Sequence, residues 1–89
     1  MKIKKGYLVH EVAGNFVVIK IGQEAVNFNG LITLSESAKL LWDLLNRENG
    51  ATVTELVNKL LEEYEIDEKT ANDDVLEFVE NLKKNNILE

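Results

Sequence analysis

The sequence of 89 residues has no cysteine, no proline and a single histidine, His10. The absence of cysteine excludes disulfides, thiol nucleophiles and zinc sites built from thiolates, and it leaves the redox compartment open. No stretch approaches the roughly 18 continuous apolar residues of a membrane-spanning helix, and the first residues lack the apolar segment of a signal peptide. We therefore predict a cytoplasmic protein with no membrane contact.

Positive charge is also scarce. Ten lysine and arginine residues stand against 16 aspartate and glutamate residues, which gives a formal net charge of −6 and a pI near 4.8. Nucleic-acid phosphates and anionic membrane surfaces repel such a protein at long range. Neither is expected as a partner.

The residues that are present have the composition of a globular domain. Apolar residues make up 45% of the chain and charged residues 29%, and a chain of this length can bury one hydrophobic core. There are no internal repeats, low-complexity tracts or linker-like segments. The prediction is a single domain over residues 1–89.

Strand-like segments fill the first third of the chain. Residues 7–12 and 16–21 are rich in β-branched and aromatic side chains, and Ala13-Gly14-Asn15 between them has the turn chemistry of a short hairpin. Residues 28–34 alternate in the manner of a third strand. An antiparallel meander of these three strands would have a well-covered second strand and would leave the third strand at an edge.

The remainder of the chain is helical. The first helix is expected to start at Thr33 or Ser35, with a capping box between Thr33 and Glu36, and to end at Asn49-Gly50. Its apolar residues cover a wide arc, so it should be buried between two neighbours, with Trp42 in the core.

Two further helices follow. A capping box from Thr52 to Glu55 is expected to open the second, and Asp67 is expected to cap the third, which ends at Asn85-Asn86 before the last residues fold back. The predicted core face of the third helix consists of Ala71, Val75, Phe78, Val79 and Leu82.

The predicted fold class is α+β: a three-stranded antiparallel β-sheet (meander) followed by a three-helix bundle, in a winged-helix-like arrangement. DNA binding is the usual function of that shape. The third helix argues against it, because acidic residues outnumber lysines along it and phosphate contacts need the opposite balance. These are Asp67, Glu68, Asp73, Asp74, Glu77 and Glu80 against Lys69, Lys83 and Lys84.

Catalytic motifs are missing. His10 lies in a predicted strand, and the sequence contains no nucleophile elbow, phosphate-binding loop, dinucleotide motif or set of metal ligands at a recognised spacing. The acidic pairs Glu62-Glu63 and Asp73-Asp74 have the pattern of solvated helix faces. We expect neither enzymatic activity nor a cofactor.

Three segments carry a resemblance to a known family: FNGLITLSESAKLLWDLL, GATVTELVNKLLEEYEID and DDVLEFVENLKKNNIL. In this order and spacing they resemble the PqqD family, named after coenzyme PQQ synthesis protein D, from about Tyr7 to Leu88. The chain departs from the family in having Ser35 where asparagine is usual. This change should alter one local hydrogen bond more than the fold.

The resemblance implies a function. PqqD-like proteins act as RiPP recognition elements, which are non-catalytic domains that bind the leader segment of a ribosomally synthesised, post-translationally modified peptide. The leader is expected to add as a strand to the edge of the third strand, in the groove between that strand and the third helix. The partner would then be a precursor peptide, together with a modifying enzyme such as a radical SAM protein or a leader peptidase.

Carried onto this chain, the resemblance assigns strand pairing to the backbone of residues 28–33. A helical projection about Val75 places four further residues of the third helix on one flank. The predicted peptide-binding residues are therefore Phe28, Asn29, Gly30, Leu31, Ile32, Thr33, Asn72, Leu76, Val79 and Lys83.

Some of these roles have alternatives. Leu76 either contacts an apolar leader side chain or packs beneath the sheet, and Lys83 either meets an acidic leader residue or complements the helix dipole. Asp74 falls on the opposite flank, with no role assigned. Two other functions also stay open: a homodimer through edge-to-edge strand pairing, and an adaptor that binds a protein through its helical face.

Overall fold

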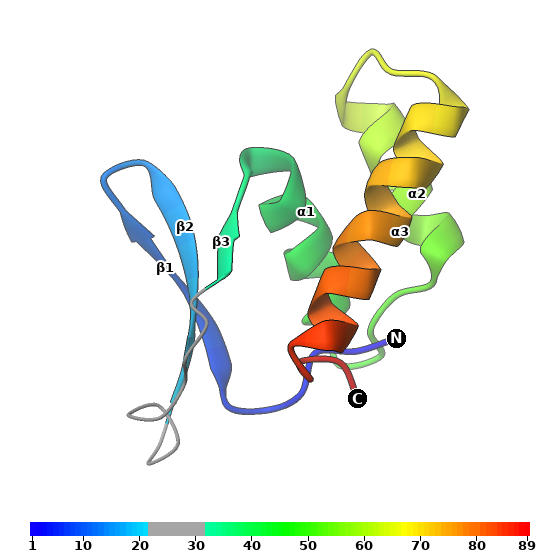
Figure 1. Ribbon diagram of the computed structural model, residues 1–89. Coiled ribbons are helices and arrows are strands. Elements are labelled where there is room, and N and C mark those ends of the chain that lie inside the picture. Colours follow the sequence, from blue (N-terminus) through cyan, green and yellow to red (C-terminus); the bar gives the residue numbers. More distant parts are fainter. Residues whose placement is uncertain (22–31) are drawn as a thin grey trace.

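The computed structural model describes residues 1–21 and 32–89. Three antiparallel strands precede three helices (Figure 1), so the predicted α+β class is confirmed. The elements are β1 (Tyr7–Val12), β2 (Asn15–Lys20), β3 (Ile32–Leu34), α1 (Glu36–Leu45), α2 (Val53–Glu63) and α3 (Glu68–Lys84).

A tight hairpin joins β1 to β2. Ala13 and Gly14 form its two-residue turn with φ of 51° and 83°, which is the left-handed backbone of a type I′ turn. Asn15 was predicted to lie in the turn but is the first residue of β2, opposite Val12.

The strand order is β1-β2-β3, so β2 is central and β3 is an edge strand, as predicted. Phe16 pairs with Leu34 and Val18 with Ile32. Val18 is fully buried, which agrees with the predicted coverage of the second strand. The first part of the predicted third strand, residues 28–31, lies outside the described residues.

Of the two predicted starts of the first helix, Ser35 is confirmed, whereas the capping box from Thr33 and the predicted end at Asn49-Gly50 were wrong. Ser35 is the N-cap, and its hydroxyl accepts a hydrogen bond from the backbone N–H of Ala38 at 3.2 Å. Thr33 belongs to β3, so it cannot form the predicted box with Glu36. The helix ends at Leu45, with Asn46 as its C-cap. Gly50, with a φ of 65°, lies further on, in the turn before α2.

The other caps were predicted correctly. Thr52 and Glu55 form a complete capping box at the start of α2, with bonds of 3.1 and 3.0 Å. Asp67 caps α3 by accepting from the backbone N–H of Thr70 at 2.7 Å. The chain end then folds back, and Leu88 forms an antiparallel bridge to Ile3.

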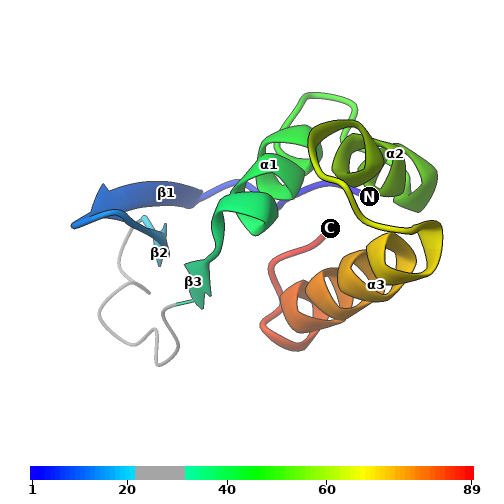
Figure 2. The ribbon, with the colours of Figure 1, turned by 90° about the horizontal axis from the view of Figure 1, so that it is seen from above.

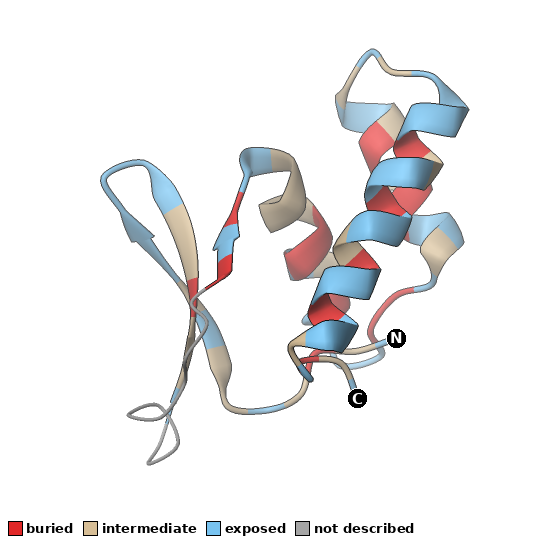
Figure 3. Ribbon diagram, in the orientation of Figure 1, coloured by how far each residue is buried: buried red, intermediate tan, exposed pale blue. Residues whose placement is uncertain are grey.

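The helices lie on one side of the sheet, where α1 contacts β3 and α2, and α2 contacts α3 (Figures 1 and 2). Buried positions lie on the surfaces that these elements turn toward each other, whereas the tip of the hairpin is exposed (Figure 3). Trp42 is 1% exposed, which confirms its predicted place in the core. Within residues 1–21 and 32–89, no helix has both the length and the apolar character needed to cross a membrane.

Candidate functional site

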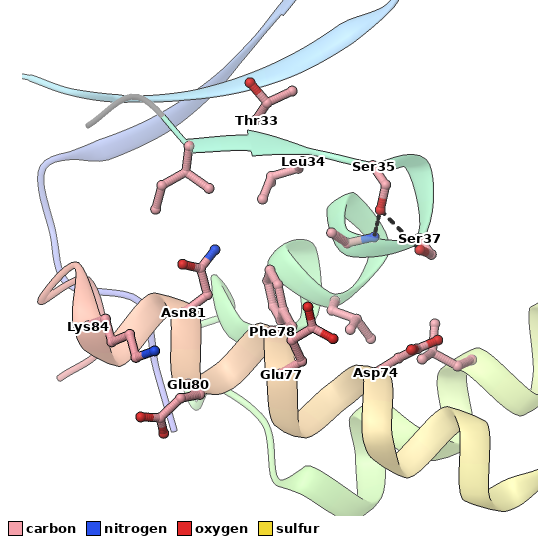
Figure 4. A pocket seen from close by; sticks show the side chains of 14 residues that line it. Thr33, Leu34, Ser35, Ser37, Asp74, Glu77, Phe78, Glu80, Asn81 and Lys84 are labelled. Carbon is pink, nitrogen blue, oxygen red and sulfur yellow. Dashed lines mark hydrogen bonds between the residues drawn. The ribbon is translucent and has the colours of Figure 1, made fainter. Parts of the chain in front are cut away.

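A groove of about 690 Å³ lies between β3, the first half of α1 and the second half of α3 (Figure 4). Its walls come from β3, α1 and α3, which are separate in the sequence but adjacent in space, and α2 contributes Leu60. The lining residues are Ile32, Thr33, Leu34, Ser35, Ser37, Ala38, Leu41, Leu60, Asp74, Glu77, Phe78, Glu80, Asn81 and Lys84.

The hydrogen-bonding direction of β2 determines which backbone groups of β3 are free. The backbone N–H of Ile21 donates to the carbonyl oxygen of Gly6 at 2.6 Å, so Ile21 directs its backbone groups toward the first strand. This direction alternates along an antiparallel strand. Phe16 and Val18 therefore direct their N–H and C=O groups toward β3.

The same alternation applies to β3. Ile32 and Leu34, opposite Val18 and Phe16, use their backbone groups for pairing with β2, and their side chains are buried. Thr33 lies between them, opposite Val17, so its backbone N–H and C=O point to the outer edge. Among the described residues no other strand pairs with this edge. It is available for an additional strand.

Phe78 and Asn81 rise from α3 toward β3 (Figure 4). Phe78 was predicted to belong to the core and does pack against it, but it is only partly buried and also lines the groove. Together with Leu41 and Ala38 of α1 it provides an apolar floor. The groove can therefore accept apolar side chains from a bound segment.

The groove mouth at α1 contains two serines. The Ser35 and Ser37 hydroxyls lie 3.1 Å apart, and Ser35 also caps the helix. Ser35 stands where the resembled family usually has asparagine. Because serine and asparagine are both good N-caps, the substitution leaves the start of α1 intact.

Among the described residues that line the groove, only those of α3 are charged. Asp74, Glu77 and Glu80 contribute carboxylates and Lys84 contributes one ammonium group, whereas the lining residues from β3, α1 and α2 are uncharged. No ion pair within the described part of the chain involves these four residues. The α3 wall is therefore acidic and open to solvent.

The predicted site residues lie in three places. Residues 28–31 are outside the described ranges, while Ile32 and Thr33 line the groove. The other four predicted residues, all on α3, are absent from its lining. Asn72 donates to the carbonyl oxygen of Glu68 at 3.0 Å, Leu76 is 53% exposed, Val79 is buried and Lys83 is exposed.

The groove is thus lined by the opposite flank of α3 from the one that we predicted. The alternative prediction for Leu76, packing beneath the sheet, was wrong because its side chain is exposed. Leader contact by these four residues stays a prediction. The sequence did contain a signal for the flank that lines the groove. At about 100° per residue, Phe78 lies at the margin of the core stripe, on the side of Asp74 and Asn81.

Other candidate groups do not converge. His10 is an exposed residue of β1, and Asp73 pairs with Lys69 on the surface of α3 at 3.0 Å. Within the described ranges, no three His, Asp or Glu side chains are arranged to hold a metal ion.

A family model described as Coenzyme PQQ synthesis protein D (PqqD) matches residues 15–88. The chain belongs to the PqqD family. The match covers β2 and β3, all three helices and the folded-back end, which are the elements around the groove. The family resemblance drawn from the sequence is therefore confirmed. No curated protein matches this PqqD-family chain significantly in sequence.

Two solved structures have the same fold as this PqqD-family chain. TbiB1, solved in complex with the TbiA(β) leader peptide, aligns with a TM-score of 0.75 and 24% identity, covering 100% of this chain and 95% of TbiB1. A lasso peptide synthetase B1 complexed with the leader peptide aligns with a TM-score of 0.72 and 21% identity, covering 97% of this chain and 93% of that protein.

Proposed function

We propose that this PqqD-family chain is a RiPP recognition element that binds the leader segment of a precursor peptide. The leader adds as a fourth strand to the free edge of β3 and fills the groove between β3 and α3. The observation that carries the proposal is the outward-facing backbone of Thr33, which borders a groove of about 690 Å³ with Phe78 on its wall.

Strand addition explains how one short peptide could use both features. Main-chain hydrogen bonds to the edge of β3 supply affinity that is independent of sequence. Side chains alternate between the two faces of a strand, so every second leader residue would lie on the face of Ile32 and Leu34 and enter the groove. Those side chains would confer specificity.

Two comparisons support this assignment. Both structural neighbours are described with a bound leader peptide, and they share the arrangement of three strands and three helices over nearly their whole length. Membership of the PqqD family points in the same direction.

The proposed role is non-catalytic and is carried out by residues 1–89 as one peptide-binding domain in the cytoplasm, where precursor peptides are synthesised. The bound leader would be presented to a modifying enzyme, such as a radical SAM protein or a leader peptidase. The exposed edge and acidic groove require neither a cofactor nor a metal for this task.

Thr33→Pro tests the strand site. Proline removes one outward N–H and its ring occupies the edge, but no bond between β2 and β3 is lost, because edge positions facing solvent tolerate proline. We expect the fold to persist and leader binding to be abolished. The measurement is a titration of isotopically labelled protein with the leader of the precursor peptide encoded beside its gene, followed by backbone amide shifts.

Glu11→Pro is the matched control. Glu11 lies opposite Phe16 in β1, so its backbone points to the other free edge of the sheet by the same alternation. This variant should bind the leader as the unsubstituted protein does. Equal binding by both proline variants would contradict strand addition at β3. A dimer whose β3 amides are protected without peptide would instead favour pairing between two copies.

A further inference from the structure

The two walls of the groove differ in charge. The lining residues from β3 and α1 are apolar or hydroxylated, whereas α3 contributes Asp74, Glu77 and Glu80 with Lys84 as the one cation in the lining. These carboxylates do not form a site by themselves. They border an apolar floor beside an open strand edge, which is the proposed leader site.

Within residues 1–21 and 32–89, no ion pair involves the carboxylates of this wall. The four ion pairs of the described residues involve other side chains: Lys39 with Asp43, Arg47 with Glu55, Lys59 with Glu63 and Lys69 with Asp73. Glu80 and Lys84 are one helical turn apart but form no ion pair. Residues 22–31 read GQEAVNFNGL and contain no lysine, arginine or histidine. These exposed carboxylates are therefore free to pair with basic groups of a ligand.

The geometry limits how many ligand residues can meet the carboxylates. In Figures 1 and 4, β3 and the second half of α3 run alongside each other in opposite directions. Asp74 and Glu80 are six residues apart, which is about 9 Å along a helix. Residues on one face of a strand repeat every roughly 6.7 Å. One or two groove-facing residues of an added strand can thus lie opposite this wall.

Building on the proposed function, we propose that the cognate leader carries lysine or arginine at one or two groove-facing positions, spaced two residues apart, next to an apolar residue over Phe78. Glu77 and Glu80 would receive the basic groups. Asp74 lines the same end of the groove as Ser35 and Ser37 at the start of α1 (Figure 4). The net charge of −6 would attract such a leader at long range.

The test is a selection from a displayed library of random linear peptides against three proteins. These are the unsubstituted protein, the groove variant Glu77→Lys/Glu80→Lys and the surface control Glu62→Lys/Glu65→Lys. Both variants change the net charge equally, and Glu62 and Glu65 are exposed residues outside the groove. Circular dichroism and thermal midpoints of all three establish that the folds are unchanged.

We expect the unsubstituted protein and the surface control to enrich peptides with Lys or Arg at two-residue spacing, and the groove variant to lose this preference. For an enriched peptide, the double reversal should weaken binding about tenfold, because each rim ion pair contributes roughly 0.2–1 kcal/mol and repulsion replaces it. The difference should shrink with added salt.

The outcomes separate this inference from the proposed function. One outcome is that the enriched peptides fail to bind Thr33→Pro, and so need the β3 edge, but show no preference for basic residues. That outcome would overturn the charge inference alone. A basic preference lost equally in the surface control would overturn it too, because the attraction would then be non-specific. Peptides that bind Thr33→Pro as tightly as the unsubstituted protein would contradict the proposed leader site itself.

Discussion

Phe78 shows how one residue can serve both the core and the site. It extends the buried stripe of α3, yet its ring is partly exposed in the groove. The sequence pattern identifies it as apolar and helical but does not show which element covers its outer side. That depends on where β3 and α1 pack, which is a tertiary property. Residue patterns alone therefore led us to predict the flank of α3 that does not line the groove.

Gly50 carries a conformational requirement that can be tested directly. Its φ is 65°, and a Cβ there would clash with the carbonyl oxygen of Met1, which accepts a hydrogen bond from the backbone N–H of Ala51 at 2.8 Å. Gly50→Ala should lower the free energy of unfolding by more than the about 1–2 kcal/mol that left-handed backbone costs a residue with a side chain. Urea unfolding measures this loss.

Gly14→Ala is the control for that substitution. Gly14 also has positive φ, 83°, but a Cβ there would meet no atom within 4 Å. It should therefore show the backbone cost alone. Equal losses in the two variants would mean that the contact with Met1 contributes nothing.

At the scale of elements, local signals predicted the helix starts best. The capping box of α2 and the aspartate cap of α3 depend on residues within one turn, so their sequence patterns were sufficient. For α1, the start at Ser35 was predicted, but the capping box from Thr33 and the end at Asn49-Gly50 were wrong because both signals serve other elements. Thr33 is drawn into β3 by pairing with Val17 across the sheet, and Gly50 is needed in the later turn.

The carboxylate caps make helix stability dependent on pH. Hydrogen bonds from the Thr52 backbone N–H and the Arg47 side chain hold the pKa of Glu55 below its ordinary value, and bonds from the Thr70 side chain and backbone do the same for Asp67. A lowered carboxyl pKa stabilises the fold above the unfolded-state pKa, and this contribution is lost as pH falls through the folded-state pKa. The thermal midpoint should therefore drop below about pH 4.

Asp67→Ser and Glu55→Gln provide the comparison for this pH dependence. Serine can still cap α3 and glutamine can still complete the box of α2, but neither titrates. The double variant should lose less stability than the unsubstituted protein between neutral pH and pH 3. An identical decline in both proteins would assign the acid sensitivity to other groups.

At the scale of the whole molecule, the sequence predicted the element order, the edge position of β3 and the family, because these depend on patterns that run through the chain. The family resemblance predicted a groove between the third strand and the third helix, but the sequence did not show which residues line it. Its lining residues come from β3, the start of α1, Leu60 of α2 and one flank of α3, and they meet only in the folded chain (Figure 4). A site assembled from separate elements has no local signature, whereas a cap does.

Leader binding should stabilise the whole fold, because strand addition requires the sheet edge and the groove together and the unfolded chain offers neither. A ligand at one hundred times its Kd contributes about 2.7 kcal/mol to the free energy of unfolding. For a domain of this size, that corresponds to a rise of roughly 10–20 °C in the thermal midpoint. Differential scanning calorimetry, with the leader of the precursor peptide encoded beside its gene, measures this rise in the thermal midpoint. Thr33→Pro should show none of it, and an unchanged midpoint of the unsubstituted protein at saturating leader would contradict selective binding to the folded state.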